Sequence, residues 1–294
     1  MTPDLVLSLF SGVGMLDAAF REQGYCVVSA GDVTWGSLYD IRAFSPPAGV
    51  FAGVIGGPPC QMWSSLAHLV RANGHEPRFG NLIPEFERVV GEALPEWWLM
   101  ENVPHAPEPA VDGYECWPRL LNNRWFDAEQ NRVRRFTIGL RSTRGLDPWR
   151  FLEVGLFEPA LSFVAVKGDP GPTRREARAV ISGNGFDSGS VYYQRQNQAA
   201  LTSRDPVPVK IGGSGKVKRT AGAVTASDGA GKVKMVRYGL ADACELQGLP
   251  RDFLADAPFT AQGKLKAVAN GVPLPMGRAV VKAVRQALGA QVRG

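Results

Sequence analysis

Cys60 lies in the run Gly56-Gly57-Pro58-Pro59-Cys60-Gln61, which joins a single thiol to two preceding prolines. Prolines fix the backbone dihedral φ, so they hold the cysteine in one orientation. The apolar run Val50–Ile55 before this motif is typical of a buried strand, and the end of such a strand is where open α/β sheets bind ligands. A lone cysteine is more often a small buried hydrophobe. In this setting we interpret Cys60 as a nucleophile.

Further charged residues stand next to predicted strands. Glu101 follows the apolar run Trp97–Met100, and a carboxyl group there can share a proton with a ring nitrogen. A capping or solvated role is the alternative. Arg132 and Arg134 precede the predicted strand Arg135–Leu140. Alternation along an extended chain places both arginines on one side, where they need carboxylates, phosphates or a bound base as partners.

A second motif has the features of a ligand-binding turn. Phe10-Ser11-Gly12-Val13-Gly14 follows the predicted strand Leu5–Phe10 and precedes a predicted helix, Met15–Gln23. Glycines in such a turn let a ligand approach the backbone beside a helix N-terminus. Asp32 is placed to accept hydrogen bonds from ribose hydroxyls, and Asp40 from an adenine amino group. Each carboxylate taken alone is more often a surface or capping residue.

Strands and helices alternate along the first 140 residues, which predicts a doubly wound parallel sheet. Further elements are predicted at Tyr25–Ala30 (strand) and at Pro84–Ala93, Leu240–Gln247 and Met276–Leu288 (helices). Between Thr143 and Lys234 the sequence is rich in Gly, Ser, Pro, Arg and Lys, with short strand-like pieces such as Ser190–Tyr193.

Composition limits the classes of function. The 294 residues are 45% apolar, enough for one large or two modest domains. Four cysteines without a C-x-x-C pair, and three histidines, predict neither a zinc site nor a disulfide framework. No secretory signal or membrane span is predicted. Between Arg141 and Arg237 there are 16 Lys or Arg against 8 Asp or Glu, which suggests a polyanionic partner; a solvated surface is the alternative.

Taken together and in this order, the motifs resemble the cytosine-C5 DNA methyltransferase family. The motifs that carry the resemblance are Phe10-Ser11-Gly12-x-Gly14, Pro58-Pro59-Cys60-Gln61, Glu101-Asn102-Val103, Gln130-x-Arg132-x-Arg134, Leu246-Gln247-Gly248-Leu249-Pro250 and Asn270-Gly271-Val272-Pro273. The resemblance covers about 200 residues and skips the basic middle segment. It implies a Rossmann-like, mostly parallel sheet with an inserted, smaller, β-rich target-recognition domain. The catalytic domain would be residues 1–142 completed by 262–294, and the recognition domain 143–261.

The resemblance also implies the chemistry. Methyl transfer from S-adenosylmethionine to C5 of a flipped-out cytosine in duplex DNA would use four catalytic residues, Cys60, Glu101, Arg132 and Arg134, and no metal. Cofactor binding would fall to Phe10, Ser11, Gly12, Val13, Gly14, Asp32 (or a neighbouring acid), Asp40, Ile41, Pro59, Leu82, Asn270 and Val272. DNA contacts would come from Gln61, Ser64, Ser65, Arg195 and Gln196.

Two alternatives remain open at this point: an RNA cytosine-C5 methyltransferase of the same fold, and a DNA-binding protein of this fold without turnover. The basic middle segment favours DNA over RNA, and the intact set Cys60, Glu101 and Arg134 favours an enzyme. The family resemblance implies a monomer in the cytoplasm of a prokaryotic or phage-infected cell. It leaves open whether a cognate restriction enzyme accompanies it.

Overall fold

A computed structural model describes residues 4–36, 39–63, 74, 79–126, 128, 132–141, 147–154, 223–227, 233–237 and 240–292. The chain divides into two compact units. The first comprises Met1–Leu121, Val133–Glu153 and Met276–Gly294, and the second comprises Asn122–Arg132 and Val154–Pro275. These bounds rest on compactness alone, so the predicted division by role, with recognition assigned to residues 143–261, stays a prediction.

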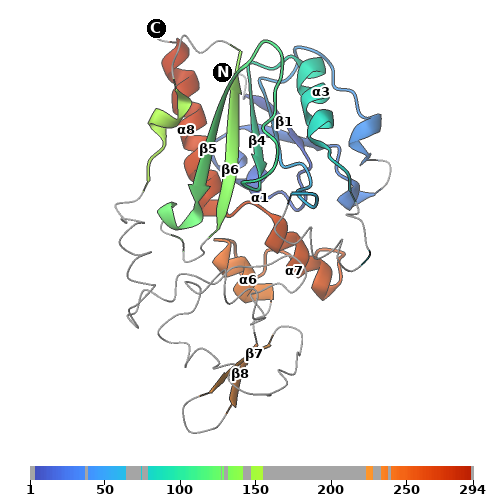
Figure 1. Ribbon diagram of the computed structural model, residues 1–294, viewed down its shortest axis with the longest axis vertical. Helices are drawn as coiled ribbons and strands as arrows, with labels where there is room; N and C mark the ends of the chain where they lie inside the picture. The colour runs from blue at the N-terminus through green and yellow to red at the C-terminus, as the bar shows by residue number, and fades with distance from the viewer. Residues whose placement is uncertain are drawn as a thin grey trace. The chain divides into compact units, whose positions relative to one another are not determined.

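The first unit is built on a sheet that has six strands among the described residues. In spatial order they are β2 (Cys26–Ala30), β1 (Leu5–Leu9), β3 (Gly53–Gly56), β4 (Trp97–Asn102), β6 (Val133–Leu140) and β5 (Glu115–Asn122). Strands β1 to β4 are parallel, and β6 runs antiparallel to β4. The prediction of a Rossmann-like, mostly parallel sheet is therefore confirmed (Figure 1).

Alternate residues of the strands face two helical layers, because successive side chains of a strand point to opposite faces. Leu7, Val54 and Trp98 share a fully buried cluster with α3 (Ile83–Ala93). On the other face Trp97 stacks on Phe20 of α1 (Met15–Glu22), with ring centroids 5.8 Å apart. Because apolar side chains point to both faces of these strands, each strand appears in the sequence as a continuous apolar run.

The C-terminal helix α8 (Leu274–Val292) joins the layer that contains α1. Arg278 of α8 makes a two-pronged hydrogen bond with Glu22, at 2.6 and 2.8 Å. Lys282 pairs with Glu153 at 2.6 Å, in the stretch that follows the short helix η5 (Pro148–Phe151). Figure 1 shows α3 and α8 flanking the sheet. The last predicted helix is thus confirmed, and it starts two residues earlier than expected.

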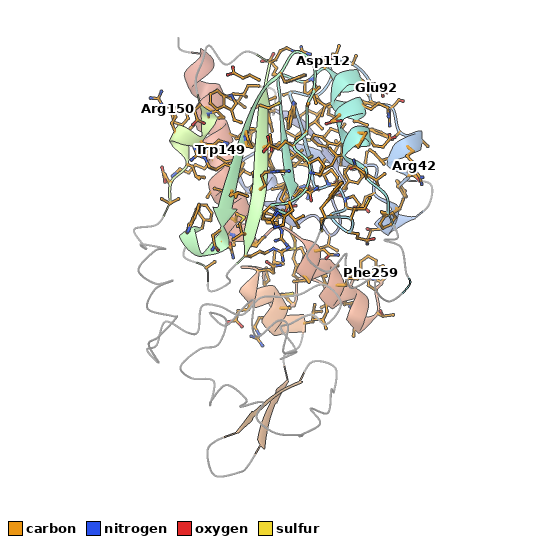
Figure 2. The ribbon with its side chains drawn as sticks, viewed as in Figure 1. Arg42, Glu92, Asp112, Trp149, Arg150 and Phe259 are labelled. Carbon is orange, nitrogen blue, oxygen red and sulfur yellow. The ribbon has the colours of Figure 1, made fainter. Side chains whose placement is uncertain are left out.

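Strand β5 and a helix of the second unit are among the elements that were not predicted. Strand β5 carries Pro118 and two charged residues, Glu115 and Arg119, and it lies at the edge of the sheet, where proline is tolerated. Trp149 covers part of it and donates from Nε1 to the carbonyl of Trp117 at 2.8 Å (Figure 2). Helix α7 (Ala261–Asn270) was also missed, because its apolar positions are interrupted by Gly263 and by lysines.

The second unit contains α6 (Leu240–Leu246), α7 and an antiparallel pair of strands, β7 (Ala223–Ser227) and β8 (Val233–Arg237). Gln247 follows α6 and is fully buried; its Nε2 donates to the carbonyl of Val268 at 2.7 Å. The predicted pieces around Ser190–Tyr193 lie outside the described residues. In the parts of the chain described above, no helix is long and apolar enough to cross a membrane.

Gly139 offers a test of the packing between β4 and β6. It lies directly opposite Trp98, and a Cβ there would overlap the indole ring of Trp98. We expect Gly139→Ala to lower the free energy of unfolding by about 1–3 kcal/mol, measured by urea denaturation, because a filled core cannot absorb the added methyl group. Gly91→Ala is the matched control: it lies in α3 with open space around it and should stabilise by about 0.5–1 kcal/mol. Equal effects at both positions would contradict this account.

Candidate active site

The functional residues of the first unit gather at one edge of the sheet. Parallel strands β1 to β4 all end at this edge, and antiparallel β6 begins there. The turn after β1, the loop after β3 and the last residues of β4 are therefore neighbours of the first residues of β6. This is the edge at which open α/β sheets bind ligands.

The turn after β1 is held in a strained conformation. Phe10, Gly12 and Gly14 have φ angles of 53°, 55° and 75° in the left-handed region. This conformation is costless for glycine but costs a residue such as phenylalanine about 1–3 kcal/mol, and such strain is concentrated at functional sites. The Gly14 N–H donates to the carbonyl of Ser11 at 2.8 Å, and Gly14 is the N-cap residue of α1. The turn thus lies directly before a helix N-terminus.

Two buried or half-buried carboxylates hold this turn in place. Asp32 follows β2 and accepts hydrogen bonds from the N–H groups of Gly12, at 2.5 Å, and Thr34, at 2.7 Å. Asp17, which is 1% exposed, accepts from the hydroxyl groups of Ser8 and Ser29 at 2.5 and 2.8 Å. Asp17 therefore ties α1 to both β1 and β2.

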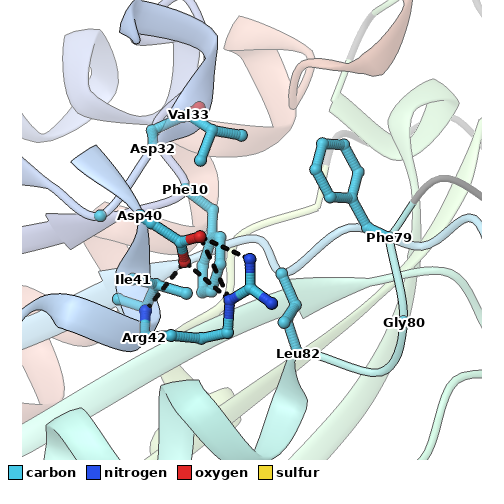
Figure 3. A pocket seen from close by; sticks show the side chains of 10 residues that line it. Phe10, Asp32, Val33, Asp40, Ile41, Arg42, Phe79, Gly80 and Leu82 are labelled. Atoms are coloured by element: carbon cyan, nitrogen blue, oxygen red, sulfur yellow. Dashed lines mark hydrogen bonds and ion pairs between the residues drawn. The ribbon is translucent and has the colours of Figure 1, made fainter. Parts of the chain in front are cut away.

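A cavity of about 110 Å³ opens beside the turn (Figure 3). Five residues predicted to bind the cofactor line it: Phe10, Asp32, Asp40, Ile41 and Leu82. Gly31, Val33, Arg42, Phe79 and Gly80 complete the lining. Apolar side chains form the walls and two carboxylates stand at the rim. This combination suits a flat, partly polar ligand such as a nucleoside, whose base packs on apolar walls and whose hydroxyl or amino groups need acceptors.

Asp40 is oriented by Arg42, which sequence reasoning did not identify. The carboxylate caps the short helix η3 (Ile41–Ala43) and accepts from the Arg42 N–H at 3.0 Å. Its two oxygens also accept from the Arg42 guanidinium, with Nε–Oδ1 at 3.0 Å and Nη2–Oδ2 at 2.5 Å (Figure 3). Hydrogen bonds from the guanidinium, and next from the backbone, lower the pKa of Asp40 to about 2. The acid stays ionised at neutral pH.

Glu101 and Arg134 form an ion pair at the same edge, with Oε1 and Nε 3.0 Å apart. Glu101 lies in β4, although it was predicted to follow that strand, and it is 8% exposed. In the β4–β6 ladder Glu101 is opposite Phe136, so Arg134, two residues away, points to the same face. An acid and a guanidinium held side by side can contact two adjacent polar atoms of one planar ring.

Cys60 lies in the loop after β3, half-buried against the core cluster. Its carbonyl accepts from the Trp63 N–H at 2.9 Å. This loop contacts the end of β4 at two successive residues. A Cβ on Gly57 would lie 3.3 Å from Oε2 of Glu101, and the Asn102 amide donates to the Pro58 carbonyl at 3.2 Å. Cys60, Glu101 and Arg134, predicted to act together, are thus carried by directly contacting segments.

Arg132 has a different environment from Arg134. It precedes β6, is 7% exposed, and donates from Nη2 to the carbonyl of Gly271 at 3.1 Å. Gly271 stands between Asn270 and Val272, so Arg132 contacts the turn that contains both predicted cofactor residues. All of these residues belong to the second unit. The assignments of Asn270 and Val272 to the cofactor, and of Arg132 to catalysis, stay predictions.

The predicted DNA contacts are described only in part. The Gln61 side chain accepts from the Phe79 N–H at 3.3 Å, which joins the Cys60 loop to a wall of the cavity. Ser64, Ser65, Arg195 and Gln196 lie outside the described residues, as does Gln130. Pro59 precedes Cys60 at the sheet edge and is not among the residues that line the cavity.

Of the residues that were missed, only Arg42 had a signal in the sequence. Its spacing of two from a predicted binding acid is the spacing at which a capping Asp bonds the backbone. Apart from Leu82, the other residues that line the cavity are 37 or more residues before Phe79 and Gly80 in the chain, and nothing in their own sequence marks these two residues.

Known proteins resemble this chain in sequence and in fold. Residues 5–162 match the family described as C-5 cytosine-specific DNA methylase. The chain is 32% identical over 173 residues to the type II methyltransferase M.FnuDI of Fusobacterium nucleatum, a match that covers 50% of this chain and 49% of that protein. It is 24% identical to the type II methyltransferase M.MthTI of Methanothermobacter thermautotrophicus, over 96% and 97% of the two chains.

A solved structure shares the fold. The crystal structure of a candidate DNA modification methyltransferase encoded within a prophage of E. coli superposes with a TM-score of 0.56 at 19% identity, over 97% of this chain and 99% of the other. At that identity the likeness concerns the fold alone.

The Asp40–Arg42 pair can be tested directly. We expect Arg42→Ala to raise the pKa of Asp40 from about 2 toward the ordinary value of about 3.9, because the largest cause of the lowering is lost while the backbone hydrogen bond remains. Carboxyl-carbon NMR titration from neutral pH downward measures it. Because the folded-state pKa is lowered, the pair stabilises the fold at neutral pH and this contribution is lost as pH falls toward 2.

Arg251→Ala is the control for this titration, since Arg251 pairs with Glu245 at 2.5 Å in the other unit and should leave Asp40 unchanged. An Asp40 titration that stays near pH 2 in Arg42→Ala would mean that the guanidinium does not set the state of this acid.

Proposed function

The chain belongs to the C-5 cytosine-specific DNA methylase family, and we propose that it transfers a methyl group to C5 of cytosine in duplex DNA at a short specific sequence. The observation that carries this proposal is the meeting of three elements at one sheet edge: the Cys60 loop, the Glu101–Arg134 pair and the cavity beside Phe10. Enzymes of this family use S-adenosylmethionine as the methyl donor. When bound, it supplies an electrophilic methyl group.

The cavity has side chains that fit the adenosyl part of this cofactor. Apolar Phe10, Ile41 and Leu82 offer surfaces for the adenine ring. Asp40, fixed by Arg42, would accept from the adenine amino group, and Asp32 from ribose hydroxyls. Carboxylates that accept hydrogen bonds from the protein retain further lone pairs for a ligand. The glycines of the turn Phe10–Gly14 would let the same ligand approach the backbone closely.

The roles at the base follow from the order of the chemistry. C5 of cytosine is a weak nucleophile, so the Cys60 thiolate adds to C6 and the electron pair moves toward C5. Glu101 holds N3 and shares a proton with it, while Arg134 donates to O2 and stabilises the charge that develops on the ring. C5 then accepts the methyl group. Loss of the C5 proton to a base and expulsion of the Cys60 thiolate restore the aromatic ring and the free enzyme.

The Glu101–Arg134 pair supports this assignment because its carboxylate and guanidinium groups lie side by side. Glu101 and Arg134 are buried to about nine-tenths and four-fifths of their side chains, with 11% and 18% exposed. A cytosine edge offers N3 and O2 side by side, so one base can contact both residues at once. A base stacked in a duplex cannot reach this edge, and rotating it out costs a few kcal/mol.

Arg132 has a supporting role in this scheme. Its hydrogen bond to Gly271 would hold the turn that offers Asn270 and Val272 to the cofactor. Sequence recognition would fall to the basic segment that contains Arg195 and Gln196, with Gln61, Ser64 and Ser65 closing on the DNA. The enzyme would act as a monomer in the cytoplasm of a prokaryotic or phage-infected cell, with or without a cognate restriction enzyme.

Cys60→Ser should abolish methyl transfer to duplex DNA, because a serine hydroxyl lacks the nucleophilicity of a thiolate. The wild-type protein should form a denaturant-resistant complex with DNA that contains 5-fluorocytosine, since fluorine at C5 cannot leave as a proton. Labelled-methyl transfer and denaturing gel electrophoresis measure the two effects.

Cys26→Ser is the matched control for the nucleophile. Cys26 is exposed at the start of β2, at the opposite end of the strands from the Cys60 loop. Its replacement should leave both readouts unchanged. Full activity of Cys60→Ser would overturn the nucleophile assignment. Transfer to tRNA but not to duplex DNA would instead favour an RNA methyltransferase.

Arg134→Ala should lose the rate of transfer far more than the affinity for DNA. Arg134 would contact one flipped base, whereas most affinity for DNA comes from phosphates. We expect a loss of about a hundredfold or more in single-turnover rate, the scale for removing one oriented charge-stabilising donor. Arg150→Ala, at an exposed position in η5, should change neither quantity. Proportional losses of rate and affinity would identify Arg134 as a phosphate contact.

A further inference from the structure

Asn102 is the last residue of β4 and is 1% exposed. Both ends of its side-chain amide are used inside the protein. Nδ2 donates to the carbonyl of Pro58 at 3.2 Å, and Oδ1 accepts from the N–H of Val103 at 2.8 Å. Pro58 is two residues before Cys60 and 44 residues before Asn102 in the chain. One side chain therefore joins the strand that carries Glu101 to the loop that carries the thiol.

The sequence of the loop makes this hydrogen bond hard to replace. Pro58 and Pro59 have no backbone N–H, so at these two positions the loop can be held by the backbone only through its carbonyl groups. A carbonyl needs a donor, and the strand residue next to Glu101 supplies one. A buried carbonyl left without a donor would cost about 1–3 kcal/mol and would be free to turn toward another partner.

The contact at Gly57 adds a steric limit next to the hydrogen bond. A Cβ at residue 57 would be 3.3 Å from Glu101 Oε2, tighter than ordinary van der Waals contact. The loop therefore passes close to Glu101 at residue 57 and is bonded to Asn102 at residue 58. Two successive contacts from two successive strand residues fix both the distance and the direction in which the chain enters Cys60.

We propose that Asn102 is a positioning residue that sets the Cys60 thiol relative to the Glu101 carboxyl group. The inference rests on the proposed function: C6 and N3 belong to one rigid cytosine ring, so the thiol and the carboxyl must reach both atoms at once. Asn102 touches neither atom. It acts through Pro58, and a misplacement of about 1 Å in such a constellation costs about a hundredfold in rate.

Asn102→Asp and Asn102→Ala separate positioning from stability. The aspartate keeps the size of the side chain and still accepts from Val103, but when ionised it turns an oxygen toward the Pro58 carbonyl and repels it. When protonated it again offers a donor. The alanine variant has no donor at any pH. Burial raises the pKa of a carboxyl group at this position, whereas Arg135, which lies opposite residue 102 in the ladder and also pairs with Glu108 at 3.6 Å, lowers it, so the titration is followed from about pH 8 down to about pH 5.

The measurement is the single-turnover rate of methyl transfer with saturating cofactor and DNA, as a ratio to the wild type at each pH. At about pH 8 we expect both variants to lose on the order of a hundredfold, with dissociation constants for S-adenosylmethionine and duplex DNA unchanged. As pH falls toward about 5 the Asn102→Asp ratio should rise while the Asn102→Ala ratio stays flat. Gln286→Glu, the same amide-to-acid change at an exposed position of α8, should match the wild type throughout.

The outcomes separate the two proposals. If the wild type forms no adduct with 5-fluorocytosine DNA, the proposed function fails. If it forms the adduct and Asn102→Asp reacts at the wild-type rate at every pH, Asn102 is not a positioning residue. Urea denaturation gives the folded fraction of each variant. If the transfer rate per folded molecule equals that of the wild type, Asn102 has a structural role only. Should the alanine variant fail to fold, the rate of the folded aspartate variant decides alone.

Discussion

The chemistry at the sheet edge depends on the register of β6 against β4. Because side chains alternate between the two faces of a sheet, a shift of one residue would move every side chain of β6 to the other face. In the observed register Glu101 and Phe136 are opposite each other, so Arg134 lies diagonally across from Glu101 on the same face. Arg135 then points to the other face, where it bonds the carbonyl groups of Ala106 and Pro107. In this register Arg134 and Arg135, which are adjacent in the chain, therefore have different partners.

Packing of the core next to this edge also favours the observed register. Trp98 lies over Gly139, and Trp97 stacks on Phe20 in the layer of α1. The large rings fit only where the facing strand has no side chain or where a helix contributes another ring. Slipping β6 by one residue would push Ile138 or Leu140 into the space of an indole group. Packing far from the reacting groups therefore fixes their relative placement, since a close-packed core tolerates few alternatives.

Much of the fold could be predicted because each central strand is an apolar run bounded by turn residues. Strand β5 could not, because Pro118 and charged residues suit an exposed edge as well as a loop. The site was predicted less evenly. Phe10, Asp32 and Asp40 occur in recognisable local contexts, and they do share a cavity. The partners of Arg132 and Asn102 are set by contacts 139 and 44 residues away in the chain, and local sequence carries no information about such pairs.

The groups of the proposed mechanism are positioned by different kinds of structure. Glu101 and Arg134 lie on strands, where the ladder itself orients the side chains, and strands position groups more accurately than loops do. Cys60 lies on a loop and lacks that support. The two prolines before it remove backbone freedom, but they also remove two donors that could have anchored the loop. A side chain that donates to a carbonyl, and whose own position is rigid, can still anchor the loop. Asn102, the final residue of the strand that carries Glu101, is buried and donates to the Pro58 carbonyl, so in the proposed mechanism the thiol and the acid are positioned by the same strand.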